Sequence, residues 1–93
     1  MLRITLISHS AEEAVLRLEG WLAEEDVAVL MKEGLRQLTA TQQLALNLAE
    51  VRFIDAAGLA LLQSWSGQRL RLLHPSSYLR TVLEAAGLEI DEG

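Results

Sequence analysis

This chain lacks several sequence features that would indicate a particular kind of site or location. It has no cysteine among its 93 residues, which excludes disulfides and thiolate metal sites and suits a reducing compartment such as the cytoplasm. The six glycines are scattered, so no phosphate-binding glycine loop is present. The longest stretch without a charge, 56–68, is well below the roughly 20 apolar residues of a membrane span. The first ten residues lack the apolar core of a signal peptide. We therefore expect a soluble protein with no direct membrane insertion.

The charge of the chain argues against nucleic-acid binding. The formal net charge is −5, whereas nonspecific binding to phosphates needs a surplus of lysine and arginine. The distribution is uneven, because residues 56–83 contain three arginines (Arg69, Arg71 and Arg80) and no acidic residue. A solvated face is the simpler interpretation of these arginines, and an anion site is the alternative.

Aliphatic residues are abundant in this chain. Hydrophobic residues make up 51% of it, and only four of its side chains are aromatic. Its length supports one core, so we expect a single domain over 1–93. Alternating apolar and polar residues predict strands over 2–8 and 14–20, joined as an antiparallel hairpin, and two more over 43–50 and 69–73. A turn is expected at 66–68, and Pro75 ends the last strand.

Three helices are expected between and after these strands. The first, over 24–38, places five apolar residues on one face: Val27, Leu30, Met31, Leu35 and Leu38. The second is short and runs from about Ala57 to Trp65. Ser76 or Ser77 caps the third helix, Gly87 ends it, and its apolar face consists of Leu79, Val82, Leu83 and Ala86.

The element order ββαβαβα predicts an α/β fold with a small mixed four-stranded sheet. Strands that are linked by helices should run parallel with right-handed crossovers. Each strand is apolar on one side only, whereas a parallel sheet that is covered on both faces needs apolar residues on both sides. We therefore expect the three helices to pack mainly on one face. The other face should be largely open or wait for a partner, and it carries Arg3, Arg17, Asn47 and Arg71.

The segment FIDAAGLALL, residues 53–62, joins the third strand to the second helix and is the candidate functional site. Asp55 can cap the helix by accepting backbone N–H bonds, and Gly58 permits the close approach of another chain. A helix N-terminus can also hold an anion. The carboxylate of Asp55, however, occupies the place that a phosphate would take, which argues against nucleotide binding.

Three segments resemble, in their order and spacing, the STAS domain (sulfate transporter and anti-sigma factor antagonist). They are LRLEGWL (16–22), LALNLAEVRFIDAAGLALL (44–62) and LRTVLEAAGL (79–88), and the resemblance covers nearly the whole chain. It implies a STAS-like fold and a bacterial regulatory protein that binds an anti-sigma kinase. In such members the kinase switches the protein off by phosphorylating a serine directly after the junction aspartate.

This chain departs from that pattern at the residues that would accept phosphate. The position of the family phosphoserine is Ala56, which has no hydroxyl group. Ala57 stands where the family often has serine or threonine, and Asn47 stands where it usually has an acid. The second helix is also shorter than is usual in the family. Phosphorylation control at this junction is therefore not expected.

Enzymatic interpretations have little support. The two histidines, His9 and His74, have no metal-ligand or nucleophile partner at the spacing of a known motif, so we interpret each as a surface residue. We predict no catalytic residue, metal ligand or cofactor. Trp21 and Trp65 either cover the edge of the core or anchor an interface.

The leading hypothesis is a non-catalytic regulatory module for protein–protein interaction, most like an anti-sigma factor antagonist without serine phosphorylation control. The alternative is the STAS subunit of an ABC-type phospholipid transport system, which binds and regulates its ATPase and needs no phosphorylated serine either. In both cases we expect a partner protein to be bound by Asp55, Ala56, Ala57, Gly58, Leu59, Leu62 and Trp65. Whether two copies of the chain form a homodimer is left open.

Overall fold

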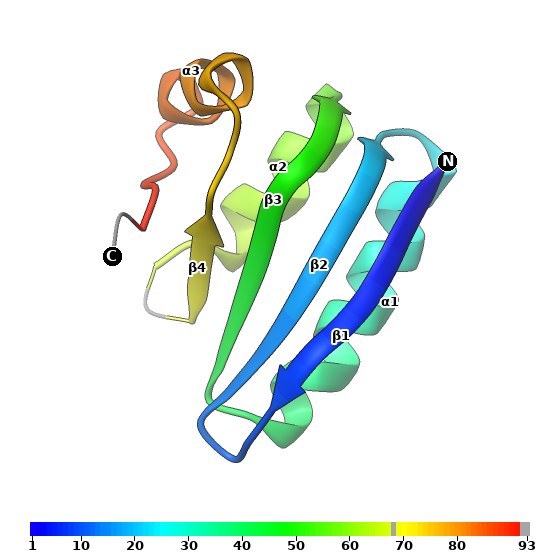
Figure 1. The fold of residues 1–93 in the computed structure, drawn as a ribbon, viewed down its shortest axis with the longest axis vertical. Helices are drawn as coiled ribbons and strands as arrows, with labels where there is room; N and C mark the ends of the chain where they lie inside the picture. Colours follow the sequence, from blue (N-terminus) through cyan, green and yellow to red (C-terminus); the bar gives the residue numbers. More distant parts are fainter. Residues whose placement is uncertain (68, 92–93) are drawn as a thin grey trace.

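The computed structural model of the chain describes residues 1–67 and 69–91. Its elements are, in chain order, β1 (Leu2–His9), β2 (Glu13–Leu22), α1 (Glu25–Ala40), β3 (Gln43–Ile54), α2 (Ala56–Trp65), β4 (Leu70–Leu73) and α3 (Ser77–Ala85). The predicted order ββαβαβα is thus confirmed (Figure 1). The turn predicted at 66–68 includes Gln68, which lies outside the described residues. No helix in the described part of the chain is long and apolar enough to cross a membrane.

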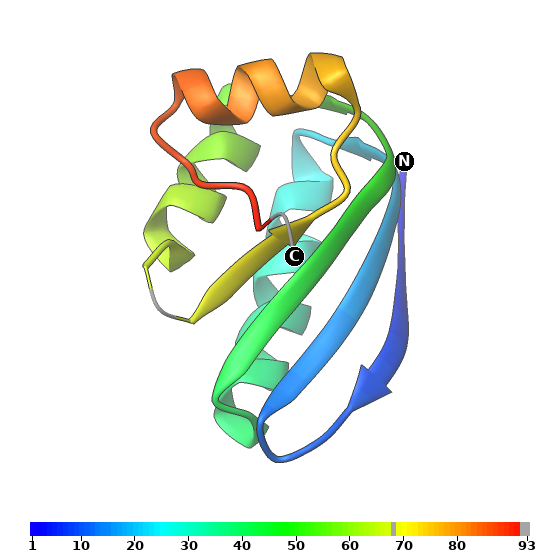
Figure 2. The same ribbon diagram turned by 60° about the vertical axis from the view of Figure 1, so that its left-hand side comes forward.

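The four strands lie side by side in the order β1-β2-β3-β4. β1 and β2 form an antiparallel hairpin, and β3 and β4 run parallel to β2, so the predicted mixed sheet is confirmed. α1 and α2 cover one face, and α3 lies across the end of the sheet beside α2 (Figures 1 and 2). The side-chain amide of Gln63 donates a hydrogen bond of 2.8 Å to the carbonyl of Ala86, which ties α2 to the end of α3.

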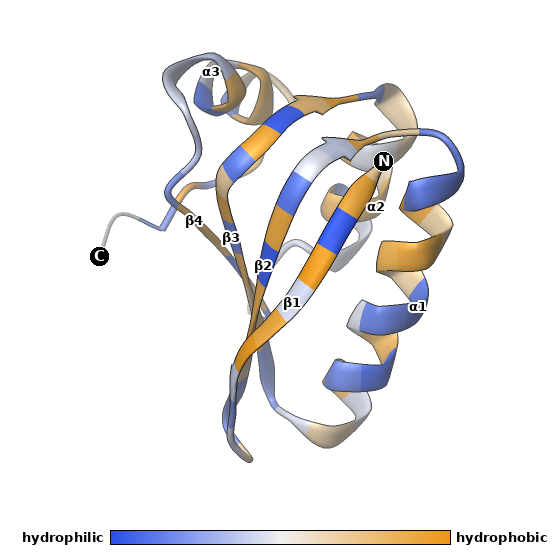
Figure 3. Ribbon diagram, turned by 45° about the vertical axis from the view of Figure 1, so that its right-hand side comes forward, coloured by the Kyte–Doolittle hydropathy of each residue, from blue (hydrophilic) through white to orange (hydrophobic). Residues whose placement is uncertain are grey.

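The core fills the space between the sheet and the helices. Alternate residues of the two central strands point into it, and the resulting hydropathy bands are visible along the strands in Figure 3. These fully or almost fully buried residues are Ala14, Leu16 and Leu18 of β2 and Leu44, Leu46 and Leu48 of β3. Burying a leucine side chain stabilises a protein by about 1.5–3 kcal/mol, so this layer supplies much of the driving force for folding.

The buried stripe of α1 differs from the predicted one. Leu30 is fully buried, but Met31 and Leu35 are 44% and 49% exposed, so their assignment to the core-facing side is wrong. Gly34 and Gln37 take the inward positions instead. The physical reason is the ring of Trp65 from α2, which lies so close to Gly34 that a Cβ atom there would come within 2.3 Å of it. This contact fixes the rotation of α1 about its axis.

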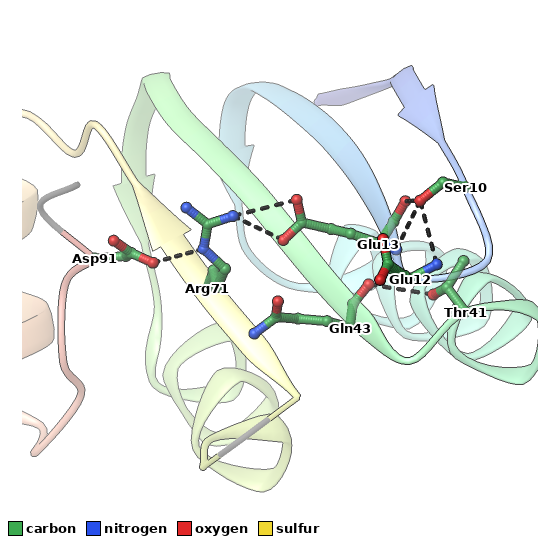
Figure 4. Close-up of polar contacts among 7 residues, drawn as sticks. All are labelled: Ser10, Glu12, Glu13, Thr41, Gln43, Arg71 and Asp91. Atoms are coloured by element: carbon green, nitrogen blue, oxygen red, sulfur yellow. Dashed lines mark hydrogen bonds and ion pairs between the residues drawn. The ribbon is translucent and has the colours of Figure 1, made fainter.

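On the face opposite α1 and α2, an ion-pair network crosses β3 (Figure 4). Nη1 of Arg71 lies 2.8 Å from Oε2 of Glu13, and Nε of Arg71 lies 2.5 Å from Oδ2 of Asp91. These two carboxylates, Asp91 first and Glu13 second, raise the pKa of Arg71. Ala45 of β3 pairs in register with Arg71 and is completely buried. The chain itself therefore covers part of the face that we predicted to be open.

The other arginines of the acid-free stretch also have partners within the chain. The guanidinium of Arg69 donates to the carbonyls of Leu38, Thr41 and Gln42 at 2.7, 3.2 and 3.1 Å, so it satisfies carbonyls at the end of α1. Arg80 lies 4.0 Å from Glu84 of the same helix. All three arginines of this stretch thus have partners within the chain, which argues against the anion site.

Two leucines of α1 give a matched test of this packing. We expect Leu30→Ala to lower the free energy of unfolding by about 2–5 kcal/mol, because it opens a cavity in the core. Leu35→Ala should change it by less than about 0.5 kcal/mol, because that side chain is half exposed. Urea unfolding followed by circular dichroism measures both values, and similar losses in the two variants would contradict the observed rotation of α1.

Candidate partner-binding site

The predicted site lies at the junction between β3 and α2, at the carboxyl ends of the parallel strands. Ile54 is buried at the end of β3, Asp55 continues in an extended conformation, and α2 begins at Ala56. The backbone N–H of Asp55 donates to the carbonyl of Leu22 at 3.1 Å. This bond fixes the start of α2 against the end of β2, as expected for neighbouring parallel strands.

The carboxylate of Asp55 accepts hydrogen bonds from the backbone of two separate segments. Its Oδ1 accepts from the N–H of Gly58 at 2.8 Å, which is the helix cap that the sequence predicts. Its Oδ2 accepts from the N–H of Glu24 at 2.9 Å, directly before α1. These two donors, Glu24 first, hold the pKa of Asp55 below its ordinary value. Asp55 therefore joins the beginnings of α1 and α2.

The second of these bonds was missed by the sequence analysis. Glu24 precedes α1 with a φ of 55°, in the left-handed region that few residues other than glycine adopt. The bond from its N–H to Asp55 holds this unusual backbone in place. Only a glutamate and an aspartate 31 residues apart take part, so no local sequence pattern could have indicated the contact.

Gly58 has a different role from the one predicted. It is buried, and a Cβ atom at this position would lie 2.7 Å from the carbonyl oxygen of Leu22. The close approach that this glycine permits is therefore made by the protein's own β2. The prediction that Gly58 lets another chain approach is wrong.

The remaining predicted residues divide between the surface and the core. Leu62 is fully buried and Leu59 is partly buried against the core, so Leu62 offers no surface to a partner. Ala56 and Ala57 are exposed. The other exposed residues of α2 are Ala60, Gln63 and Ser64. The accessible side of α2 is thus a strip that begins with small methyl groups.

Trp65 is partly buried and links α2 to α1. Its ring packs on Gly34, and beside it lies a groove of about 490 Å³ that is lined by Leu35, Leu38, Thr39, Ser64, Trp65, Ser66 and Arg69. α1 and α2 run in the same direction, so the exposed Met31 lies one helical turn nearer to Asp55 than Leu35 does (Figure 1). Leu35 thus lies beside Trp65 of α2, and Met31, four residues earlier, is on the same side of α1.

A pair of exposed aromatic rings lies at the same end of the sheet. Trp21 and Phe53 are partners in register at the ends of β2 and β3, 56% and 39% exposed, and their ring centroids are 5.8 Å apart in an edge-to-face arrangement. Each ring directly precedes a buried aliphatic residue, Leu22 or Ile54. The segments GWL (20–22) and RFI (52–54) share this pattern of an aromatic residue before a buried aliphatic one, so the sequence could have indicated the pair. Trp21 therefore does not cover the edge of the core.

The other residues singled out from the sequence form no site. His9 and His74 are both exposed. Asn47 is partly buried, and its Oδ1 accepts a hydrogen bond of 3.0 Å from the N–H of Ala49, beside an irregularity in the pairing of β2 and β3. Among residues 1–67 and 69–91, no three acidic or histidine side chains are grouped so that they could hold a metal ion.

Comparisons with known proteins agree with this fold. The family model described as "Mlab, STAS domain" matches residues 5–90. The chain belongs to the STAS-domain family. It is also similar to the solved structure of the anti-sigma factor antagonist SpoIIAA in its unphosphorylated form, with a TM-score of 0.75 and 26% sequence identity over 92% of this chain and 82% of that one. None of the curated proteins searched matches the chain. The resemblance inferred from the sequence is thus confirmed.

The bonds of Asp55 predict a pH dependence that can be measured. Because its pKa is lowered in the folded protein, its contribution to stability is fully present above the ordinary aspartate pKa of about 3.9 and is lost as the pH falls through the folded value. Asp55→Asn keeps one acceptor but cannot accept from both N–H groups. It should therefore be less stable than the unaltered protein at pH 7, and the gap should shrink below about pH 4.

Thermal unfolding between pH 7 and pH 2.5 measures this gap. Glu25→Gln, which removes a carboxylate from an exposed neighbouring side chain, is the control and should show no comparable gap at pH 7. A gap for Asp55→Asn that is independent of pH would contradict the assignment.

Proposed function

We propose that this STAS-domain protein is a non-catalytic regulator that acts in the bacterial cytoplasm by binding a partner protein through the start of α2. It is most like an anti-sigma factor antagonist, but it works without control by serine phosphorylation. The observation that carries this proposal is the chemistry of the junction. Both oxygens of the Asp55 carboxylate accept hydrogen bonds from backbone N–H groups. The next two residues, Ala56 and Ala57, expose methyl groups and have no hydroxyl group.

The state of Asp55 supports a junction that takes no part in catalysis. Both of its oxygens accept backbone N–H bonds, and its lowered pKa keeps it ionised at neutral pH. An efficient general acid or base has a pKa near the working pH and reaches the reacting group. Asp55 meets neither condition, which supports a binding role in place of catalysis.

The contact surface that we propose contains the accessible members of the predicted set and three additional residues. Ala56, Ala57 and Ala60 provide a flat apolar strip on α2, and Met31 and Leu35 extend it onto α1. Short side chains lose little entropy on binding and allow a partner backbone to come close. Asp55 caps the helix that carries this surface, and Gly58 and Leu62 pack beneath it. Trp65 packs on Gly34 and so fixes the spacing of α1 and α2.

The same observation favours a second candidate, the STAS subunit of an ABC-type phospholipid transport system. Such a subunit binds and regulates its ATPase and needs no phosphoserine, so Ala56 suits it equally well. The two candidates use the same surface and differ in the partner. Binding to a transporter ATPase, with none to anti-sigma kinases, would select the second candidate.

Binding measurements with matched alanine variants test the proposed surface. The purified chain is titrated calorimetrically with each anti-sigma kinase and each ABC ATPase encoded by the same genome. Ala57→Glu should weaken binding to the cognate partner by about tenfold or more, because it places a charge in an apolar contact. Ala49→Glu adds the same charge at an exposed alanine of β3 and should bind like the unaltered protein. Equal affinities of the two variants would contradict the proposed surface.

Phosphate incorporation tests the lack of a serine switch. When the chain is incubated with the anti-sigma kinases and labelled ATP, we expect no labelling, since the family position is Ala56. Ala56→Ser restores a hydroxyl group at that position and should become labelled by a kinase that binds the chain. Phosphate on any serine of the unaltered protein would show that a different residue has taken over the switch.

A further inference from the structure

Met31 is one of the two methionines of the chain, and its side chain is accessible on the proposed contact surface. In the observed rotation of α1 this side chain is 44% exposed. It lies on the same side of α1 as Leu35, which borders the groove beside Trp65. The thioether sulfur of Met31 is therefore open both to reagents in solution and to a partner that covers this surface.

The core of the domain does not use the Met31 side chain. In the part of the chain that the structure describes, Met31 belongs neither to the buried cluster nor to the partly buried side chains that pack against it. Its neighbour Leu30, by contrast, is a fully buried member of that cluster. A chemical change at the sulfur of Met31 therefore leaves the packing of the core intact and acts on the surface alone.

The surroundings of Met31 on this surface are apolar. None of its neighbours three and four residues away along α1 carries a charge; they are Val27, Ala28, Gly34 and Leu35. The whole of α2, Ala56–Trp65, also contains no charged residue. Lys32 and Arg36 line the groove on the other side of α1, next to β1. A partner that covers Met31 thus makes an uncharged, apolar contact.

The exposed polar side chains of α2 already donate hydrogen bonds within the chain. The amide of Gln63 donates to the carbonyl of Ala86 at 2.8 Å, and the hydroxyl of Ser64 donates to the carbonyl of Leu61 at 2.7 Å. A strong acceptor at position 31 would therefore take its hydrogen bonds from water in the free protein. A partner that excludes this water would bury an unsatisfied polar group, which is unfavourable.

Oxidation by hydrogen peroxide would create such an acceptor. The sulfur of methionine attacks one oxygen of the peroxide, and the O–O bond breaks as the S–O bond forms. The sulfur is oxidised by two electrons to the sulfoxide, and the peroxide is reduced to one molecule of water. Methionine sulfoxide is polar, whereas the thioether is apolar. The chain has no cysteine whose thiolate would compete for the oxidant.

We propose that Met31 is an oxidation-sensitive site through which peroxide weakens partner binding. This inference rests on the proposed function, because it concerns the same contact surface, and it gives that surface a chemical control that needs no hydroxyl group. Oxidation converts an apolar contact into a polar one while the domain stays folded. Enzymatic reduction of the sulfoxide restores the thioether and with it the affinity.

Mass spectrometry of the peroxide-treated chain tests the site without a partner. We expect the sulfoxide to form at Met31 at a rate within about threefold of that at Met1, which is 97% exposed. Circular dichroism and thermal unfolding should show that the oxidised chain is folded. A saturating amount of the cognate partner should protect Met31 and leave Met1 reactive. Resistance of Met31 to peroxide, or unfolding on its oxidation, would overturn the inference.

Calorimetric titration with the cognate partner tests the effect on binding. Oxidation of the unaltered chain should weaken binding by about tenfold or more, and methionine sulfoxide reductases should reverse the loss. Met31→Leu removes the sulfur but keeps an apolar side chain. The affinity of this variant should therefore be the same before and after peroxide, although its Met1 is still oxidised.

Two results of this titration would overturn the inference. One is an equal loss of affinity in Met31→Leu, which would place the sensitive group elsewhere. The other is an unchanged affinity of the oxidised, unaltered chain. Ala57→Glu then separates the two proposals, because weaker binding by that variant would leave the proposed function standing while the role of Met31 is rejected.

Discussion

The geometry of the candidate site depends on the carboxylate of Asp55 and its two hydrogen bonds. One oxygen caps α2 through Gly58 and the other holds the N–H of Glu24 ahead of α1. Two helices that are distant in sequence thus begin from the same charged group. An ionised acceptor makes stronger hydrogen bonds than a neutral one, so the arrangement is most stable when Asp55 is ionised. Two packing contacts complete this frame: the approach of Gly58 to Leu22 and that of Trp65 to Gly34.

Much of the fold could be predicted from the sequence because each strand carries its leucines at alternate positions and buries one face only. The alternation in 43–50 indicates which side of β3 faces the helices. A shift of the strand register by one residue would turn Leu44 and Leu46 to solvent. The rotation of α1 could not be predicted in this way. Leu30, Met31 and Leu35 are all apolar, and the packing of Trp65 on Gly34, which helps to decide which of them faces inward, is not visible in the sequence.

The site was predictable in position but not in its contacts. A strand end, an aspartate and small residues before a leucine-rich helix indicate a capped helix start, and Asp55 is that cap. The bond to Glu24 and the pairing of Trp21 with Phe53 depend on how β2 and β3 align, so they required the structure. Helical spacing alone does not tell which side of a short apolar helix meets the sheet. The structure completely buries Leu62, which is one of the predicted partner-binding residues.

The proposed partner-binding surface at the start of α2 consists of the exposed methyl groups of Ala56 and Ala57, which are held in place by the hydrogen bonds of Asp55. Membership of the STAS-domain family supports a regulatory role at the level of the family. Ala56, at the position expected for the family phosphoserine, has no hydroxyl group.

The most direct test of the central claim is cross-saturation NMR on the complex with the cognate partner. The partner is protonated and irradiated, and the chain is deuterated apart from its alanine methyl groups. We expect the signals of Ala56, Ala57 and Ala60 to lose intensity, while the signal of Ala49, which is exposed on β3, should keep it. Loss of intensity at Ala49 with none at the three alanines of α2 would contradict it.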